Sequence, residues 1–180
     1  MMNKLKIHLK KIKLNNYQIE KIEAIFDEIL ILEKGEYFLK QDRVCEQFGF
    51  ILVGMCRYFH KVNNEEVTNW VSLHNEFIVS SNSFAMQTKA IENIQAIKTT
   101  EILITSAEKW QQLMADEEFA EQLWQLINKQ NYFGIENQNF DFFKLNATER
   151  YNWFLNRQPQ FNTLIPIKYL APILGVDKKN

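Results

Sequence analysis

The chain has 180 residues, of which 46% are hydrophobic and 24% are charged, and its formal net charge is -1. This length allows one or two domains with a sizeable core, and the composition excludes a disordered chain. A net charge near zero gives no global electrostatic reason to expect nucleic-acid binding, so a DNA-binding role has to rest on a local element.

Two cysteines, Cys45 and Cys56, are too few for a disulfide framework, and their spacing fits no zinc motif. The N-terminal lysines are not followed by the uninterrupted apolar run and cleavage site of a signal peptide, and no segment has the ~18 apolar residues of a membrane span. We therefore expect a reduced, cytoplasmic protein with no membrane partner.

Residues Met1–Leu14 alternate lysine with aliphatic residues, which predicts a short basic amphipathic helix. Such a helix can act as a membrane or nucleic-acid arm, or it can pack one face on the rest of the protein; we favour packing. Asn15 and Gln18 have the spacing of a capping box. They predict a second helix, in which Ile19 and Ile22 recur at helical spacing.

The stretch 34–105 is typical of antiparallel strands separated by turns. The predicted turns are Lys34-Gly35-Glu36, the polar loop Gln41-Asp42-Arg43, Gly54 after the apolar run Phe48–Val53, and the pair Asn63-Asn64. Asparagine tolerates positive φ, so this pair suits a tight hairpin. The last strands are expected at Ile91–Thr99 and Glu101–Thr105.

Helices are predicted again after the strands, the first capped by Ser106. Asp116–Phe143 is the longest helical candidate, and one glutamine interrupts its apolar seam: Phe119, Leu123, Leu126, Ile127, Gln130 and Phe133. Such a seam packs either on its own domain or on a second subunit. Asn146 is expected to cap Ala147–Arg157, and a further helix is expected to begin at Pro166 and end at Gly175.

The KGE turn, the strand that ends at Gly54, the hairpin and the segment Asn75–Phe84 follow one another in an order that resembles the cyclic-nucleotide-binding β-roll of the bacterial Crp/Fnr transcriptional regulators. The segments Ala147–Tyr151 and Ile165–Ala171, with Leu174–Val176, resemble the start of that family's DNA-binding half. The resemblance implies a mainly β fold with added helices. It would be an antiparallel double-stranded β-helix, or jelly roll, with flanking helices, a long dimerisation helix and a partial winged-helix domain.

The implied domains are a β-roll with N-terminal helices over residues 1–115, a dimerisation helix over 116–143 and a truncated helix-turn-helix domain over 144–180. In the resembled family the helix at 116–143 pairs two subunits. The apolar seam would then be a dimer interface, and a homodimer is expected.

In nucleotide-binding members of the resembled family, a glutamate holds the ribose hydroxyl and an arginine about ten residues later neutralises the phosphate. Alignment on Asn75–Ile78 places Val79 at a usual glycine, Ser80 at the glutamate, and Ala90 or Ile91 at the arginine. These features are missing, so we expect weak or absent binding of cyclic AMP and cyclic GMP, and no other cofactor.

The side chains of Ser80–Ser83 offer neutral donors and acceptors, so another small polar ligand is an open alternative there. An ordinary polar loop is the interpretation that we favour for these residues. Lys89 is the nearby cation, but it lacks the guanidinium fork. The candidate ligand-binding residues are Asn75, Ser80, Ser81, Asn82, Ser83 and Lys89.

The resembled DNA-binding half is incomplete in this chain. Pro166–Leu174 resembles the first helix of a helix-turn-helix, and the recognition helix would begin at 178–180. Pro172 removes a backbone hydrogen bond inside the first helix. We expect no reading of DNA sequence, and DNA as a partner only if the native chain continues past Asn180. Weak nonspecific phosphate contacts are expected from Lys168, Lys178 and Lys179.

The sequence does not indicate catalysis. His8, His60 and His74 lack metal-ligand spacing, and no phosphate loop or nucleophile motif is present. The shortage of histidines argues against a jelly-roll enzyme, so no enzymatic activity is expected. Two functions stay open: a Crp/Fnr-type transcriptional regulator with a degenerate nucleotide site, and a non-DNA-binding ligand-sensing or protein-interaction module derived from that family.

Overall fold

The protein is represented by a computed structural model that describes residues 2–63, 65–128, 144–157 and 164–175. The strands are β1 (Glu28–Leu32), β2 (Tyr37–Leu39), β3 (Gln47–Val53), β4 (Met55–Val62), β5 (Glu65–Leu73), β6 (Phe77–Ile78), β7 (Asn93–Ala96) and β8 (Thr100–Ser106). The helices are α1 (Met2–Lys11), α2 (Asn16–Ile25), α3 (Ser81–Met86), α4 (Ala107–Asp116), α6 (Ala147–Arg157) and α8 (Ile167–Ile173), and residues 118–128 are also helical.

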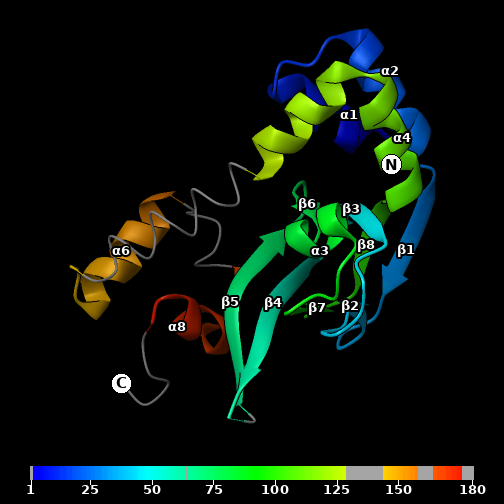
Figure 1. The fold of residues 1–180 in the computed structure, drawn as a ribbon. Helices are drawn as coiled ribbons and strands as arrows, with labels where there is room; N and C mark the ends of the chain where they lie inside the picture. Colours follow the sequence, from blue (N-terminus) through cyan, green and yellow to red (C-terminus); the bar gives the residue numbers. More distant parts are fainter. Residues whose placement is uncertain (1, 64, 129–143, 158–163, 176–180) are drawn as a thin grey trace.

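The strands form two four-stranded antiparallel sheets, with the orders β1-β8-β3-β6 and β2-β7-β4-β5. Helices α1, α2 and α4 lie together at one end of the sheets, and α8 lies beside β5 (Figure 1). This arrangement confirms the antiparallel β-roll with flanking helices. The strand expected at Ile91–Thr99 is shorter than predicted and spans only Asn93–Ala96.

Residues with positive φ mark the tight turns of the roll. The φ angles are +94° at Gly35, +98° at Gly54 and +51° at Asn63, which confirms the predicted turns there. A Cβ atom at Gly54 would lie 2.6 Å from the Cα atom of Thr100. Glycine therefore serves here both for the turn and for the close approach of β8.

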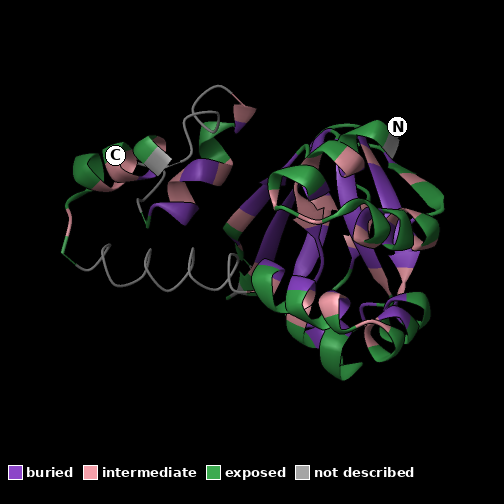
Figure 2. Cartoon of the chain, turned by 90° about the horizontal axis from the view of Figure 1, so that it is seen from above, coloured by how far each residue is buried: buried purple, intermediate pink, exposed green. Residues whose placement is uncertain are grey.

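An aromatic cluster centred on Phe48 closes one end of the roll. The Phe48 ring is fully buried, and its centroid lies 4.7 Å from Trp110, 5.1 Å from Phe77 and 5.7 Å from Trp124. Buried residues run along the strands of the roll and along one side of the helices that cover it (Figure 2). Helix α4 and the helical residues 118–128 are thus part of the same core as the strands.

The N-terminal helices also belong to this core. Leu5 and Leu9 of α1 are fully buried in it, so the packed helix was the correct alternative for this segment. Asn15 and Gln18 form the predicted capping box, in which each side chain accepts a hydrogen bond from the other residue's backbone amide.

The predicted helix Asp116–Phe143 begins later than expected. Helix α4 runs through Asp116, and Glu117 is extended, with φ -137° and ψ 108°. The Glu117 carboxylate accepts a hydrogen bond from the Tyr17 hydroxyl at 2.5 Å and forms an ion pair with Lys21 at 3.2 Å. These contacts with α2 fix the break, and the helix resumes at residue 118. Residues 129–143 lie outside the described part of the chain.

The C-terminal helices pack on the roll through a second apolar core. Asn146 caps α6 through reciprocal hydrogen bonds with Glu149, and Gly175, with φ +62°, follows α8, as predicted. Pro166 stands one position earlier than expected, at the N-cap of α8. The buried apolar residues of this core are Met55, Val71, Leu73, Ile97, Phe154, Ile165, Leu170, Ile173 and Leu174.

Candidate functional site

Helix α3 begins within Ser80–Ser83, the segment for which a polar loop was favoured, so that prediction is wrong for residues 81–83. The hydroxyl of Ser83 is buried; it accepts a hydrogen bond from the Cys45 amide at 2.9 Å and donates one to the Thr88 carbonyl at 2.5 Å. These tertiary bonds stabilise a short helix that has no apolar repeat in its sequence. Ser83 therefore has a structural role.

The other predicted ligand-binding residues do not converge. Asn75 is exposed in the β5–β6 turn, and its amide donates to the Ile51 carbonyl at 2.7 Å. Asn82 and Lys89 are exposed, and Ser81 is half-buried. Ser80 differs from these, because it is buried and its hydroxyl bonds to an acidic side chain that was not singled out from the sequence.

That acidic side chain is Glu92, which lies just before β7 and is half-buried. Burial raises the pKa of the Glu92 carboxyl because the charged form is poorly solvated. Hydrogen bonds from the Ser80 and Asn69 side chains and the charge of His60 act in the opposite direction. The only sequence signal for this site is an acidic residue next to the position of the missing arginine.

A β-bulge lets Asn69 reach this site. Tyr58 pairs with Trp70 and Phe59 pairs with Thr68, so Asn69 has no partner in the β4–β5 ladder. Such a bulge redirects a side chain and bends the strand. It places Asn69 next to Glu92 instead of on the regular alternation of β5.

Tyr58 extends the polar groups into the centre of the roll. Its hydroxyl accepts a hydrogen bond from the Val79 amide at 3.3 Å and bonds to the Ser72 side chain, and burial raises its pKa. Tyr58 also packs in the main apolar core. We call the buried or half-buried set Tyr58, Ser72, Ser80 and Glu92 the interior polar cluster, and Asn69 contacts it from the exposed side of β5.

The positions that the resemblance assigned to a phosphate-binding arginine are built differently. Ala90 is buried, with its backbone hydrogen-bonded to Asp42 and Arg43 at 2.9 and 2.8 Å. Ile91 is 83% exposed. Neither side chain can neutralise an anion, and the neighbouring Glu92 carries a negative charge when ionised.

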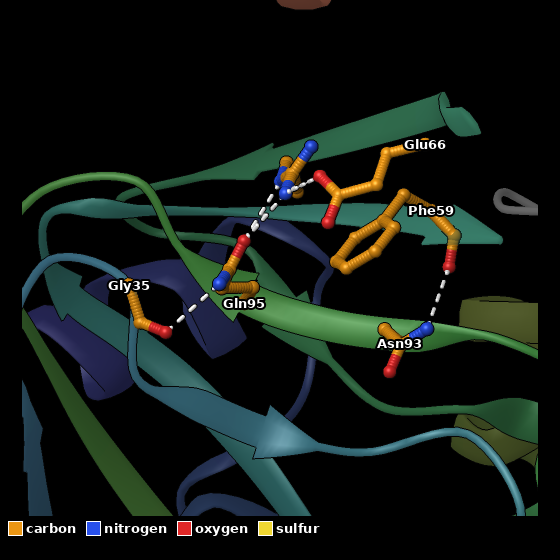
Figure 3. Close-up of polar contacts among 6 residues, drawn as sticks. Gly35, Phe59, Glu66, Asn93 and Gln95 are labelled. Atoms are coloured by element: carbon orange, nitrogen blue, oxygen red, sulfur yellow. Dashed lines mark hydrogen bonds and ion pairs between the residues drawn. The ribbon is translucent and has the colours of Figure 1, made fainter. Parts of the chain in front are cut away.

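A buried arginine, Arg57, lies on the face of β4 opposite to Tyr58. The Arg57 side chain is 8% exposed, and its guanidinium donates to the Gln95 side-chain oxygen at 2.6 and 3.0 Å and to the Glu66 carboxylate at 2.5 Å. Gln95 in turn donates to the Gly35 carbonyl at 2.8 Å (Figure 3). The sequence signal for this network was one charged residue, Arg57, within the otherwise apolar stretch Met55–Phe59 of β4.

The Arg57 guanidinium also contacts the C-terminal part of the chain. It lies 3.9 Å from the ring centroid of Phe59 and 5.0 Å from that of Tyr169 in α8. Successive side chains of a strand point to opposite faces. Strand β4 thus presents Cys56 and Tyr58 to the roll core and Met55 and Arg57 to the C-terminal helices.

Some residues of the predicted dimer seam are buried in their own roll, and others are exposed or lie outside the described residues. Leu123 and Ile127 are 3% and 4% exposed and lie in the core of their own roll, with Phe119 packed against it. These side chains are therefore not available to a second subunit in this fold. Leu126 is 38% exposed. Gln130 and Phe133 lie outside the described residues, and homodimerisation stays a prediction.

The predicted DNA contacts are placed only in part. Lys168 is exposed on α8, with its ammonium 4.7 Å from the Tyr169 ring centroid. Lys178 and Lys179 lie outside the described residues. The buried side of α8 carries Leu170 and Ile173, which pack towards the roll.

The described residues contain no group of three or more histidine, cysteine, aspartate or glutamate side chains arranged to hold a metal ion. Among the helices of the described ranges, none combines the length and the apolar character required to cross a membrane. Cys45 and Cys56 are both buried and free, and burial raises the pKa of the Cys56 thiol to about 12.

No protein-family model matches the chain, and no curated protein matches it. Solved structures do resemble it. FixK2 from Bradyrhizobium japonicum has a TM-score of 0.72 at 11% identity, over 83% of this chain and 77% of that one. A cyclic nucleotide-binding domain from Methylobacillus flagellatus has a TM-score of 0.63 at 15% identity, over 81% and 84%.

The sensor domain of the transcriptional regulator DNR from Pseudomonas aeruginosa has a TM-score of 0.57 at 11% identity, over 76% of this chain and 95% of that one. At these identities the likeness concerns the fold. It agrees with the strand order and the flanking helices described above. The chain therefore has the β-roll fold of cyclic-nucleotide-binding domains and Crp/Fnr-type regulators.

Proposed function

We propose that this chain is the sensing part of a Crp/Fnr-type transcriptional regulator and that its roll does not bind cyclic AMP or cyclic GMP. The likeness to FixK2 and to the sensor domain of DNR supports the regulator assignment. The observation that carries the ligand proposal is Glu92, a half-buried carboxyl bonded to Ser80 and adjacent to the position of the missing arginine. A second anion beside this carboxylate would be repelled instead of neutralised.

Calorimetric titration of the purified chain with cyclic AMP and with cyclic GMP tests the ligand proposal. We expect no saturable binding heat at millimolar nucleotide. The Glu92→Gln variant keeps the side-chain shape and removes the charge, and Glu20→Gln is a matched control at an exposed position on α2. A Kd below about 0.1 mM for the unmodified chain, which corresponds to roughly 5 kcal/mol, would refute the proposal.

The second candidate function is a sensing or interaction module that does not bind DNA. The observation that favours it is the burial of Leu170 and Ile173 against the roll, because α8 is the segment that resembles the first helix of a helix-turn-helix. Fluorescence anisotropy with a random-sequence DNA duplex at low and high salt distinguishes the two. Salt-sensitive binding lost in Lys168→Gln would favour DNA contact, and no binding at low salt would favour the module.

We propose a regulatory and not an enzymatic role for the chain. The structures with similar folds include regulatory and cyclic-nucleotide-binding domains. The polar side chains of the interior cluster bond to one another.

A further inference from the structure

The carboxylate of Glu92 carries a negative charge that the fold leaves uncompensated. Among the residues that the structure describes, no lysine, arginine or histidine forms an ion pair with this half-buried side chain. His60 acts on it only through its charge, and the hydrogen bonds come from the neutral side chains of Ser80 and Asn69. A partly desolvated carboxylate without a cation is unfavourable, so a positively charged ligand would stabilise this part of the roll.

The strand register places this charge towards the interior of the roll. Phe59 of β4 pairs with Asn93 of β7. The next residues along the two strands, His60 and Glu92, therefore stand opposite each other. Because alternate side chains of a strand share a face, Glu92 lies on the same face as Ile94, which is fully buried in the roll core.

The same carboxylate is also within reach of solvent. Asn69 is exposed at the bulge of β5, and His60 is half-buried. Ser80, in contrast, is buried. Since Glu92 bonds to both Asn69 and Ser80, it lies between an exposed amide and a buried hydroxyl group. A ligand can therefore approach the carboxylate from the side of Asn69.

The hydrogen-bonding capacity of these groups favours a ligand that only donates. An ionised carboxylate offers about four acceptor positions, and Ser80 and Asn69 use only part of them. A protonated primary amine donates three hydrogen bonds and accepts none. A ligand carboxylate or phosphate would meet Glu92 as a like charge. A metal ion would need further ligands, and the described residues group no three acidic, histidine or cysteine side chains for it.

We propose that the roll binds a small primary amine in its protonated form, with Glu92 and the side-chain oxygen of Asn69 accepting hydrogen bonds from the ammonium group. Ser80 holds the Glu92 carboxylate in place from the buried side. The ligand thus has the opposite charge to a cyclic nucleotide. This inference rests on the proposed function in taking the interior of the roll as the sensing side, and it adds the chemical class of the ligand.

Three probes of similar size separate the effect of charge from that of shape: propylammonium, 1-propanol and propionate. Each is titrated into the full chain labelled with 15N, and the backbone amide shifts are followed by NMR. We expect saturable shifts at Asn69, Ser80 and Glu92 with propylammonium, and none with 1-propanol or propionate. Glu92→Gln should weaken the binding of propylammonium by roughly 10- to 100-fold, because it removes hydrogen bonds to a charged acceptor.

Two further variants act as controls. Glu20→Gln makes the same chemical change at an exposed position of α2 and should leave the binding of propylammonium unchanged. Glu92→Asp keeps the charge and shortens the side chain by one methylene, so it should bind propylammonium more tightly than Glu92→Gln does.

The proposal is refuted if propylammonium shows no saturation with a Kd below about 0.1 M, if propionate or 1-propanol causes the same shifts, or if Glu92→Gln binds as the unmodified chain does. The comparison of the three probes needs only the unmodified chain, so it decides the question even where a variant does not fold. Calorimetric binding of cyclic AMP would refute the proposed function without supplying the propylammonium result. The two proposals can therefore fail separately.

Discussion

Glu76 is expected to make the stability of this protein depend on pH. Its carboxylate lies in the turn between β5 and β6 and accepts a hydrogen bond from the Leu73 amide at 3.0 Å. Burial raises the pKa of this carboxyl from 4.5 to about 7, and the bond from Leu73 offsets only part of that effect. The folded state therefore binds the proton more tightly than the unfolded chain does.

The sign follows from this raised pKa. The contribution of Glu76 to the free energy of unfolding is fully present below about pH 4.5 and is lost as the pH rises to about 7. A shift from 4.5 to about 7 corresponds to about 3 kcal/mol at 1.36 kcal/mol per unit. Because the side chain is only half-buried and solvent screens its charge, we expect about 2–3 kcal/mol.

Urea unfolding of the wild type and of Glu76→Gln between pH 4.5 and 8 measures this contribution. Glutamine keeps an oxygen for the Leu73 amide and does not ionise, so the two proteins should be similar at pH 4.5. At pH 8 the variant should be more stable by about 2–3 kcal/mol. Glu20→Gln, on the exposed side of α2, controls for the loss of one charge. A stability difference that does not change with pH would refute the reasoning.

Three further predictions concern the core, a turn and the predicted dimer. Phe48→Ala should destabilise the fold by about 3–5 kcal/mol and Phe48→Leu by only about 1–2, because leucine fills most of the volume within the aromatic cluster; equal losses in thermal unfolding would contradict this. Gly54→Ala adds positive-φ strain and a backbone collision, and Gly35→Ala adds the strain alone, so we expect losses of about 3–5 and 1–2 kcal/mol respectively. If the chain dimerises through the helix at 118–128, Leu126→Glu should lower the mass in analytical ultracentrifugation, and the exposed neighbour change Gln125→Glu should not; an unmodified chain that is monomeric at high concentration rules out the dimer.

Local sequence determined several of the turns and helix boundaries. The capping box of Asn15, the cap at Asn146 and the glycines at 35, 54 and 175 were all predicted correctly. Each depends on bonds or backbone angles within a few residues, so the information is contained in the adjacent sequence. The order of these signals was also sufficient to identify the β-roll.

The apolar seam shows which features of a helix can be predicted from hydrophobic periodicity. It predicted a helix with one buried face, and the described part of that helix is present. It did not predict which surface covers that face, and Leu123 and Ile127 pack on their own roll. The same pattern suits an intramolecular or an intermolecular partner, because burial of apolar area is not directional.

The polar sites were decided by the tertiary structure. Helix α3 is held by the hydrogen bond that the Cys45 amide donates to the Ser83 hydroxyl, 38 residues away in sequence, and no local pattern predicts this bond. Glu92 reaches Asn69 only because a bulge redirects β5, and Arg57 is buried only because β7 and α8 lie beside it. Sequence alone could thus predict the fold and show that positions 90 and 91 carry no arginine, because these depend on local patterns and residue identity. The groups that replace that arginine, and the face on which α8 docks, depend on contacts between distant segments, and only the folded chain brings those segments together.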